Sequence, residues 1–362
     1  MFYDKHTYQT FIPTLILCMI FVITYPTLTH AKEPKLQEKK VVAYLESGEY
    51  WEFTELYEKT LEKLIKLRIR EKLVFPPELH ISMKVAEDSA LLAKAAELMS
   101  NPDIDLILAM GTHATAALLK VNNKKTPIVS VAVSDPEGMG FVDPYKGTVA
   151  SNLTIHYIKD QWNIMFRTLS AALKVKRLGI MYTDTPEGRT FSNVQAAREI
   201  GRESGYTLIE YPYIDKEESY TSSAEGIDAL IKAHIDTFYV PELTSFDWDT
   251  GHPEVFINEL HRNGVKTFTR NGSTQVRNGV LMGLALTTTS SLATFYADTI
   301  GRKLGLLPIN APTRHVKETP IFTINLVAAK ELNMDFPLSL LVATDLIYDN
   351  TLPVVKNLES ID

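Results

Sequence analysis

The sequence predicts an α/β protein with two Rossmann-like lobes, each a parallel sheet flanked by helices. Its 362 residues exceed the roughly 100–200 residues of a usual single domain. Short apolar runs rich in β-branched residues alternate with longer amphipathic stretches, as they do in the strand–helix–strand units of a parallel sheet. The same alternation begins a second time after residues 147–153. We therefore expect two doubly wound lobes with separate cores.

The first series of elements lies between residues 41 and 133. Apolar residues recur at three- and four-residue spacing over Phe53–Leu67 and Asp88–Met99, which predicts two covering helices. The apolar runs around these helices predict strands at Val41–Leu45, Leu79–Met83, Ile104–Met110 and Ile128–Val133.

The second series repeats this order without visible sequence identity, which indicates two similar lobes instead of an array of short repeats. Its helices are predicted at Asp160–Leu173, Glu187–Ser204 and Ser223–Ala233. Its strands are predicted at Arg177–Tyr182, Thr207–Tyr211 and Thr237–Val240.

The end of the chain holds too few elements for a third lobe: Val280–Leu286, helix Leu292–Leu304, strand Ile321–Asn325 and short helices around Ala328–Leu332. We expect the chain to cross back and complete both sheets. The predicted N-terminal lobe is 39–152 plus 280–310, and the C-terminal lobe is 153–279 plus 311–350. Several crossovers of this kind would form a hinge.

Residues 1–31 read as a cleaved secretory signal peptide, with an apolar run from Phe11 to Ile23 and a small-residue ending at Ala31. A membrane anchor is the alternative, but the run is shorter than the roughly 20 residues of a spanning helix.

Cys18 is the one cysteine. Lipidation of Cys18 is disfavoured because bulky Leu17 precedes it. We expect a periplasmic protein that is not lipidated and has no disulfide.

Charge and motifs exclude several classes of protein. The net charge is −7 and the basic residues are scattered, so nucleic acid is not an expected partner. The chain has no GxSxG, GxxxxGK[ST] or HExxH motif and no glycine fingerprint after the first strand. The nine histidines show no metal-ligand spacing. We therefore expect no enzyme activity, no metal and no cofactor.

Ligands of open parallel sheets bind outside the carboxyl ends of the strands, so the loops that follow the strands hold the candidate binding residues. Thr112 could contact an anion at a helix N-terminus, or it could only cap that helix. Asp135 could receive an ammonium group, or it could form an Asx turn before Pro136. The aromatic Trp51 could stack on a ligand or pack against its own lobe. The candidates in the first lobe are Glu46, Ser47, Thr112, His113, Ser134 and Asp135, and those in the second are Thr183, Glu187, Glu242 and Asn271.

Several of these segments together resemble the ABC-transporter substrate-binding proteins of the tryptophan- and tyrosine-binding type, which have the periplasmic binding protein type I fold. The resemblance covers almost the whole mature chain. It is carried by DLILAMGTHA (residues 105–114), PIVSVAVSDP (127–136), GTVASNL (147–153) and FTINLVAAKEL (322–332).

The resemblance implies capture of a small molecule between the lobes, with an aromatic amino acid as the favoured type of ligand, and delivery to an ABC permease in the inner membrane. It also places Thr112, His113, Ser134 and Asp135 in loops that meet the ligand. The chain departs from the family at Arg270–Thr274, where an acidic residue is common. Either Glu242 or Asp135 would then receive the ammonium group, or the ligand is not an amino acid. We expect a monomer, with a sensory module for a membrane receptor as the alternative and an enzyme as the third choice.

Overall fold

The computed structural model describes residues 39–46, 48, 50–83, 88–213, 219–248, 251–308, 320–349 and 352–355. The predicted signal peptide, Cys18 and Ser47 lie outside the described residues. Among the helices of the described ranges, none is both long enough and apolar enough to cross a membrane.

The first sheet is parallel throughout and has the strand order β2-β1-β4-β5-β8, with β3 also paired to β1. Its strands are β1 (Lys40–Glu46), β2 (Leu73–Val74), β3 (His80–Ser82), β4 (Leu106–Met110), β5 (Ile128–Val131) and β8 (Leu153–Ile155). The helices of this lobe are α1 (Trp51–Lys66), α2 (Asp88–Ser100), α3 (Gly111–Lys120) and α10 (Thr289–Lys303), and a short β6–β7 hairpin (Val142–Asp143, Gly147–Thr148) accompanies them.

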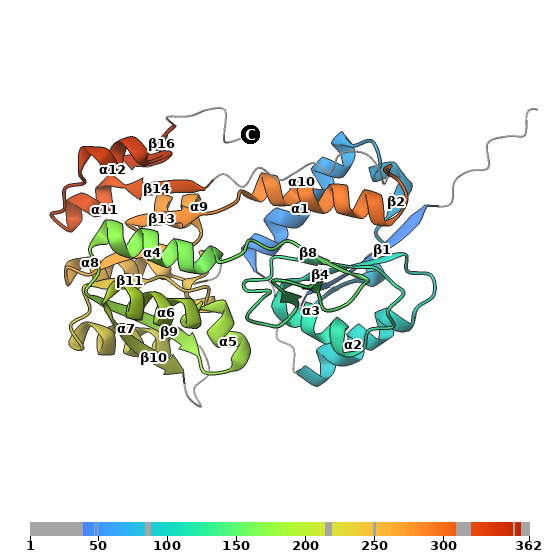
Figure 1. The fold of residues 1–362 in the computed structure, drawn as a ribbon, viewed down its shortest axis with the longest axis horizontal. Helices are drawn as coiled ribbons and strands as arrows, with labels where there is room; N and C mark the ends of the chain where they lie inside the picture. Colours follow the sequence, from blue (N-terminus) through green and yellow to red (C-terminus); the bar gives the residue numbers. More distant parts are fainter. Residues whose placement is uncertain are drawn as a thin grey trace, which may run out of the picture. The chain divides into compact units, whose positions relative to one another are not determined.

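Side chains of β1 and β4 alternate between two cores, as the two-residue period of a strand requires. Val42 and Tyr44 lie in the core under α1 and α10, whereas Ala43 and Leu45 lie in the core under α2 and α3. Both faces of the sheet are therefore covered, which explains why its strands read as continuous apolar runs. Figure 1 shows α10, which comes late in the chain, beside α1.

The second sheet has the order β10-β9-β11-β12-β13-β14-β15-β16, and its pairs are parallel except β13–β14 and β15–β16. Its strands are β9 (Arg177–Thr183), β10 (Thr207–Tyr213), β11 (Thr237–Tyr239), β12 (Lys266–Thr269), β13 (Met282–Ala285), β14 (Ile321–Asn325), β15 (Leu346–Asp349) and β16 (Leu352–Val355). Its helices are α4 (Gln161–Leu173), α5 (Pro186–Phe191), α6 (Val194–Ser204), α7 (Tyr220–Lys232), α8 (Pro253–Arg262), α9 (Gly272–Arg277), α11 (Leu326–Glu331) and α12 (Leu338–Ala343).

The two sheets repeat one strand arrangement, β3-β1-β4-β5-β8 in the first and β10-β9-β11-β12-β13 in the second. This repetition confirms the prediction of two α/β lobes with parallel sheets flanked by helices. The chain passes between the sheets three times: after β8, after β13, and between α10 and β14.

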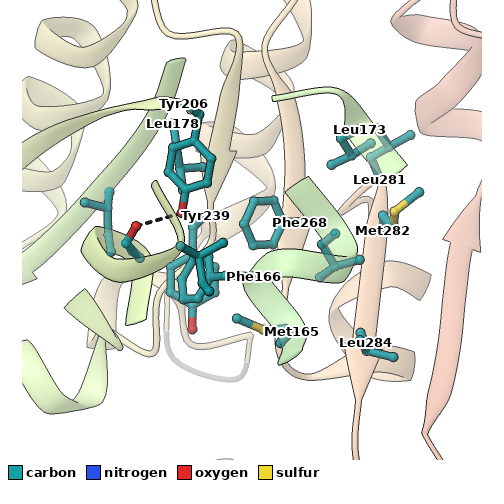
Figure 2. Packing of buried hydrophobic residues seen from close by; sticks show 14 of the residues in the cluster. Met165, Phe166, Leu173, Leu178, Tyr206, Tyr239, Phe268, Leu281, Met282 and Leu284 are labelled. Carbon is teal, nitrogen blue, oxygen red and sulfur yellow. Dashed lines mark hydrogen bonds between the residues drawn. The ribbon is translucent and has the colours of Figure 1, made fainter. Parts of the chain in front are cut away.

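Three aromatic side chains pack together within one hydrophobic core of the second lobe (Figure 2). Phe166 of α4 packs against Tyr239 of β11 and Phe268 of β12, with ring centroids 5.0 and 5.7 Å apart. All three are fully buried, and burial of each such side chain contributes roughly 1.5–3 kcal/mol. This packing fixes the carboxyl ends of β11 and β12 against α4.

Three sequence predictions require correction. The helix predicted at Glu187–Ser204 is two helices, α5 and α6, because Asn193 between them adopts a left-handed φ of 53°. Leu153, predicted to open the second lobe, belongs to β8 of the first sheet. The strand predicted at Val280–Leu286 was assigned to the first lobe but pairs with β12 in the second sheet. A short helix, α9, joins these two parallel strands, and consecutive strands usually pair.

We predict that Leu169→Ala destabilises the protein by about 2–5 kcal/mol, because Leu169 is fully buried in the core of the second lobe and its loss leaves a cavity. Leu338→Ala is the matched control, since Leu338 is 76% exposed, and it should change stability by less than about 0.5 kcal/mol. Urea unfolding followed by circular dichroism measures both. Equal effects of the two substitutions would contradict this account of the core.

Candidate ligand-binding site

A cavity of about 340 Å³ is lined by residues from both lobes. Trp51 and Glu52 of α1 and Val133 and Ser134 after β5 contribute from the first lobe, and a set from the second lobe includes Gln161, Trp162, Arg270 and Asn271. Several of these residues follow the carboxyl ends of strands, where parallel sheets bind ligands. The volume is within the range of small-molecule pockets.

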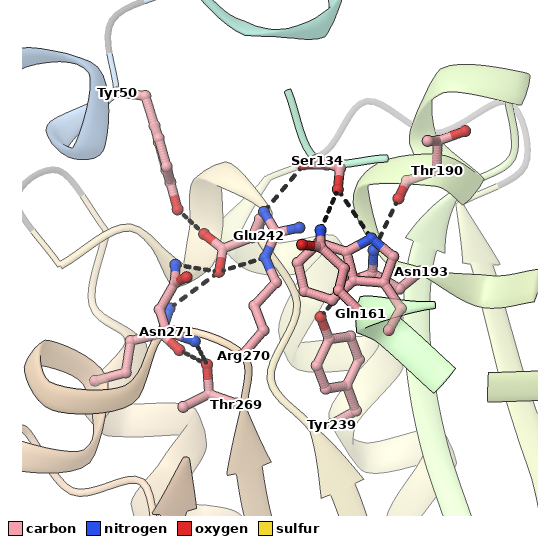
Figure 3. A network of polar contacts seen from close by, with 12 residues as sticks. Tyr50, Ser134, Gln161, Thr190, Asn193, Tyr239, Glu242, Thr269, Arg270 and Asn271 are labelled. Atoms are coloured by element: carbon pink, nitrogen blue, oxygen red, sulfur yellow. Dashed lines mark hydrogen bonds and ion pairs between the residues drawn. The ribbon is translucent and has the colours of Figure 1, made fainter. Parts of the chain in front are cut away.

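A buried ion pair stands at this cavity (Figure 3). Glu242 follows β11 and Arg270 follows the neighbouring strand β12, so the two side chains meet with 3.3 Å between Arg270 Nε and Glu242 Oε1. Only 5% of the Glu242 side chain and 7% of the Arg270 side chain are exposed. Burying two charges is costly unless their remaining lone pairs and protons are also hydrogen-bonded.

The Glu242 carboxylate is satisfied by several donors. Asn271 Nδ2 donates to Oε1 at 2.6 Å, and the Tyr50 hydroxyl donates to Oε2. Gln275 Nε2 lies 3.5 Å from Oε1. Burial raises the pKa of Tyr50 well above its ordinary value, and the charge of Glu242 raises it further, so Tyr50 remains a donor at neutral pH. Both carboxylate oxygens therefore accept hydrogen bonds from the protein itself.

Ser134 connects the first lobe to the second through three hydrogen bonds. Arg270 Nη2 donates to its hydroxyl at 3.1 Å, while Trp162 Nε1 and Gln161 Nε2 donate to its carbonyl oxygen at 2.9 and 3.3 Å. The Tyr50–Glu242 contact is a further bond between the lobes. These bonds join loops that follow strands of both sheets around one cavity.

Three buried polar atoms of residues that line the cavity have no hydrogen-bond partner among the described residues. They are Arg270 Nη1, Trp51 Nε1 and Thr287 Oγ1. The Arg270 guanidinium also lies over the Trp162 ring, 5.0 Å from its centroid, which is a cation–π contact. Since the indole N–H and the guanidinium can only donate, the site has unused donor capacity.

Glu52, which lines the cavity, has a raised pKa. Burial and the nearby negative charge of Glu242 raise its pKa from 4.5 to about 8, although Arg270 acts in the opposite direction. Glu52 is therefore mostly protonated at neutral pH. Burial acts to lower the pKa of Arg270, but the negative charge of Glu242 outweighs it and raises that pKa.

The structure brings three of the sequence-predicted residues together: Ser134, Glu242 and Asn271 all bond to Arg270 or to its partner. Two others are engaged elsewhere in the first lobe. Glu46 accepts hydrogen bonds from Tyr44 and Ser82. Asp135 accepts from the Gly138 amide at 2.8 Å, which is the Asx turn considered as its alternative.

The loop after β4 does not line the cavity, contrary to the expectation for Thr112 and His113. Gly111 has a φ of +81°, and a Cβ there would lie 2.6 Å from the Phe53 ring, so this ring covers the start of α3. Thr112 is inside α3 and does not cap it, because Met110 holds the N-cap position. The His113 ring contacts Phe191 of α5 edge-on at 5.1 Å.

Thr183 and Glu187 lie at the end of β9 and in the first turn of α5, and the cavity lining does not include them. Among the described residues, no group of three His, Cys, Asp or Glu side chains is placed to hold a metal ion.

The centre of the site, Arg270, was noticed in the sequence only as a departure from the family pattern. Tyr50, Glu52 and Trp162 were not predicted. A signal for Arg270 did exist, because a charged residue directly follows an apolar strand there, as Glu242 follows another. Adjacent parallel strands place such residues side by side, but the sequence does not say which strands are adjacent.

The fold and the site together define a class of protein: a two-lobed α/β protein with a cavity lined by residues of both lobes. No family model and no curated protein matches the chain. Several solved structures match it in fold. An ABC domain in complex with L-Trp from Streptococcus pneumonia has a TM-score of 0.65 at 18% identity, covering 86% of this chain and 100% of that one.

A conserved domain protein from Vibrio cholerae gives the same values, a TM-score of 0.65 at 18% identity with 86% and 100% coverage. A leucine-binding protein from Thermotoga maritima has a TM-score of 0.52 at 12% identity, covering 73% of this chain and 83% of that one. These likenesses show that the chain has the two-lobed periplasmic binding protein type I fold, as the resemblance in sequence implied.

We predict that Glu52 makes the protein less stable as the pH rises. Its folded-state pKa of about 8 exceeds the ordinary 4.5, so between these values the folded protein holds a proton that the unfolded chain releases. Glu52→Gln removes this effect. As the pH rises from about 5 to about 8, the melting temperature of the wild type should therefore decrease relative to that of the variant.

Thermal melts followed by circular dichroism at several pH values measure this difference. Glu58→Gln is the control, because Glu58 is an exposed residue of the same helix. A difference in melting temperature between the wild type and the Glu52→Gln variant that stays constant with pH would refute the raised pKa of Glu52.

Proposed function

We propose that this protein is the periplasmic solute-binding component of an ABC import system and binds one small molecule in the cavity between its lobes. The observation that carries the proposal is the composition of the cavity. Loops after strands of both sheets line the cavity, and the Arg270–Ser134 hydrogen bond joins residues of the two lobes there. The solved structures of similar fold include proteins whose names state binding of L-Trp and of leucine, which supports a solute-binding role.

The proposed mechanism is closure of the lobes around the ligand. Three crossovers connect the lobes, and a few residues at such connections can absorb the change of backbone angles in a hinge motion. In the closed form, Ser134 and Tyr50 of the first lobe bond to Arg270 and Glu242 of the second. A ligand that contacts both lobes adds to these bonds and shifts the population towards the closed form.

The proposed partner is an ABC permease in the inner membrane, which would recognise the closed form. Closure changes the relative positions of surfaces on the two lobes, so a partner that touches both can distinguish loaded from empty protein. We propose that the protein acts as a monomer in the periplasm and carries out no catalysis. Solved structures of similar fold are named as binding proteins and transporter subunits.

Binding is tested by titration calorimetry and thermal shift with amino acids, small carboxylic acids and monosaccharides. We predict that a ligand at about 100 times its Kd stabilises the folded protein by about 2.7 kcal/mol. Arg270→Ala should weaken that ligand at least about tenfold, since a hydrogen bond to a charged group contributes about 1.5–3 kcal/mol.

Arg262→Ala is the matched control, because the Arg262 side chain is 75% exposed on α8, and it should bind the ligand as the wild type does. Removing Arg270 alone leaves Glu242 buried without its partner. The double variant Arg270→Gln, Glu242→Gln therefore repeats the test without a buried charge. No binder in any of the three classes, or unchanged affinity in both Arg270 variants, would overturn the proposal.

A further inference from the structure

Building on the proposed function, we propose that the ligand is a small carboxylic acid with an apolar body and no ammonium group. Its carboxylate would bind the Arg270 guanidinium and the Trp51 indole N–H. The inference depends on a count of which donors and acceptors the protein has already used at the cavity.

The carboxyl groups at and beside the cavity are already paired or neutral. A carboxylate has about four lone-pair sites, and Glu242 receives Tyr50, Arg270 and Asn271, with Gln275 at 3.5 Å. Glu242 is therefore already neutralised by Arg270, and it is not among the residues that line the cavity.

The two carboxyl groups that line the cavity, Glu52 and Glu55, offer no better site for a cation. Glu55 is paired with Lys59 at 2.8 Å. Glu52 is mostly protonated at neutral pH because burial and Glu242 raise its pKa to about 8. An ammonium group in this cavity would lose its hydration without gaining a free anionic partner, which is unfavourable.

Some donors of the residues that line the cavity, in contrast, are unused. Arg270 Nη1 and Trp51 Nε1 are buried and have no partner among the described residues, and the Thr287 hydroxyl, which can donate or accept, is also unpartnered. A buried donor without an acceptor is unfavourable. A ligand that supplies acceptor oxygens removes this cost, and a carboxylate supplies them with the charge opposite to that of Arg270.

Part of the remaining lining is apolar and fits an apolar ligand body. Leu56 and Val133 line the cavity from the first lobe and Met165 and Leu284 from the second, beside the Trp162 ring. Sugar hydroxyls against these side chains would lose their hydrogen bonds to water. The lining thus combines charged and polar donors with an apolar portion, which fits a carboxylate on a hydrocarbon body.

Two series of probes with a constant body test the inference by titration calorimetry. The first is 4-methylpentanoate, L-leucine and 4-methylpentanamide, and the second is 3-phenylpropanoate, L-phenylalanine and 3-phenylpropanamide. In at least one series, the plain carboxylate should bind about tenfold or more tightly than the amino acid and the amide. An amino acid that binds as tightly as its plain carboxylate overturns the inference.

Failure of the inference and failure of the proposed function are distinguishable. If no plain carboxylate binds but an amino acid or a monosaccharide does, the carboxylate inference is wrong and the solute-binding role stands. If no compound of any class binds, the proposed function fails as well.

A pair of matched tryptophan variants tests the role of Trp51. Trp51→Phe removes the indole N–H and keeps an aromatic ring, so it should weaken the carboxylate about tenfold. Trp248→Phe makes the same change at a tryptophan whose Nε1 is also buried and unpartnered but which is not among the residues that line the cavity. It should leave the affinity unchanged. Equal effects of the two substitutions would exclude Trp51 from the binding of the carboxylate.

Discussion

The buried ion pair between Glu242 and Arg270 is the point at which hydrogen bonds from the first lobe reach the second. Each side chain is almost completely removed from water, and two buried charges are tolerated only when their other lone pairs and protons are hydrogen-bonded. The second lobe supplies part of this requirement through Asn271, and the first lobe supplies the rest through Tyr50 and Ser134. These hydrogen bonds join the lobes around Arg270 and Glu242, in addition to the edge-on contact of His113 with Phe191.

The fold holds this pair at the cavity through the order of its strands. Glu242 and Arg270 follow adjacent parallel strands, β11 and β12. Below them, Phe166 packs against Tyr239 and Phe268 and keeps these strand ends in place. A rigid aromatic core thus supports a polar network in which unsatisfied donors remain beside an apolar wall.

Much of the fold could be predicted from local pattern, because strands buried on both faces and amphipathic helices each leave a periodic signal. The strand β9 and the helix α4 were located to within a residue at each end. The break at Asn193 was missed, since a left-handed residue between two short helices leaves the apolar period nearly intact. The lobe boundaries near Leu153 and Met282 were misplaced because pairing of distant strands has no local signal.

The sequence by itself determined the α/β class and the repeated lobe, since these follow from local periodicity. It also indicated which loops follow strands, where parallel sheets bind ligands. It also selected Ser134, Glu242 and Asn271. Only the tertiary structure decided that Arg270 joins these three, that the Phe53 ring covers Gly111, and that the pKa of Glu52 is raised. The reason is physical: burial, hydrogen-bond satisfaction and pKa depend on neighbours that are far apart in the chain.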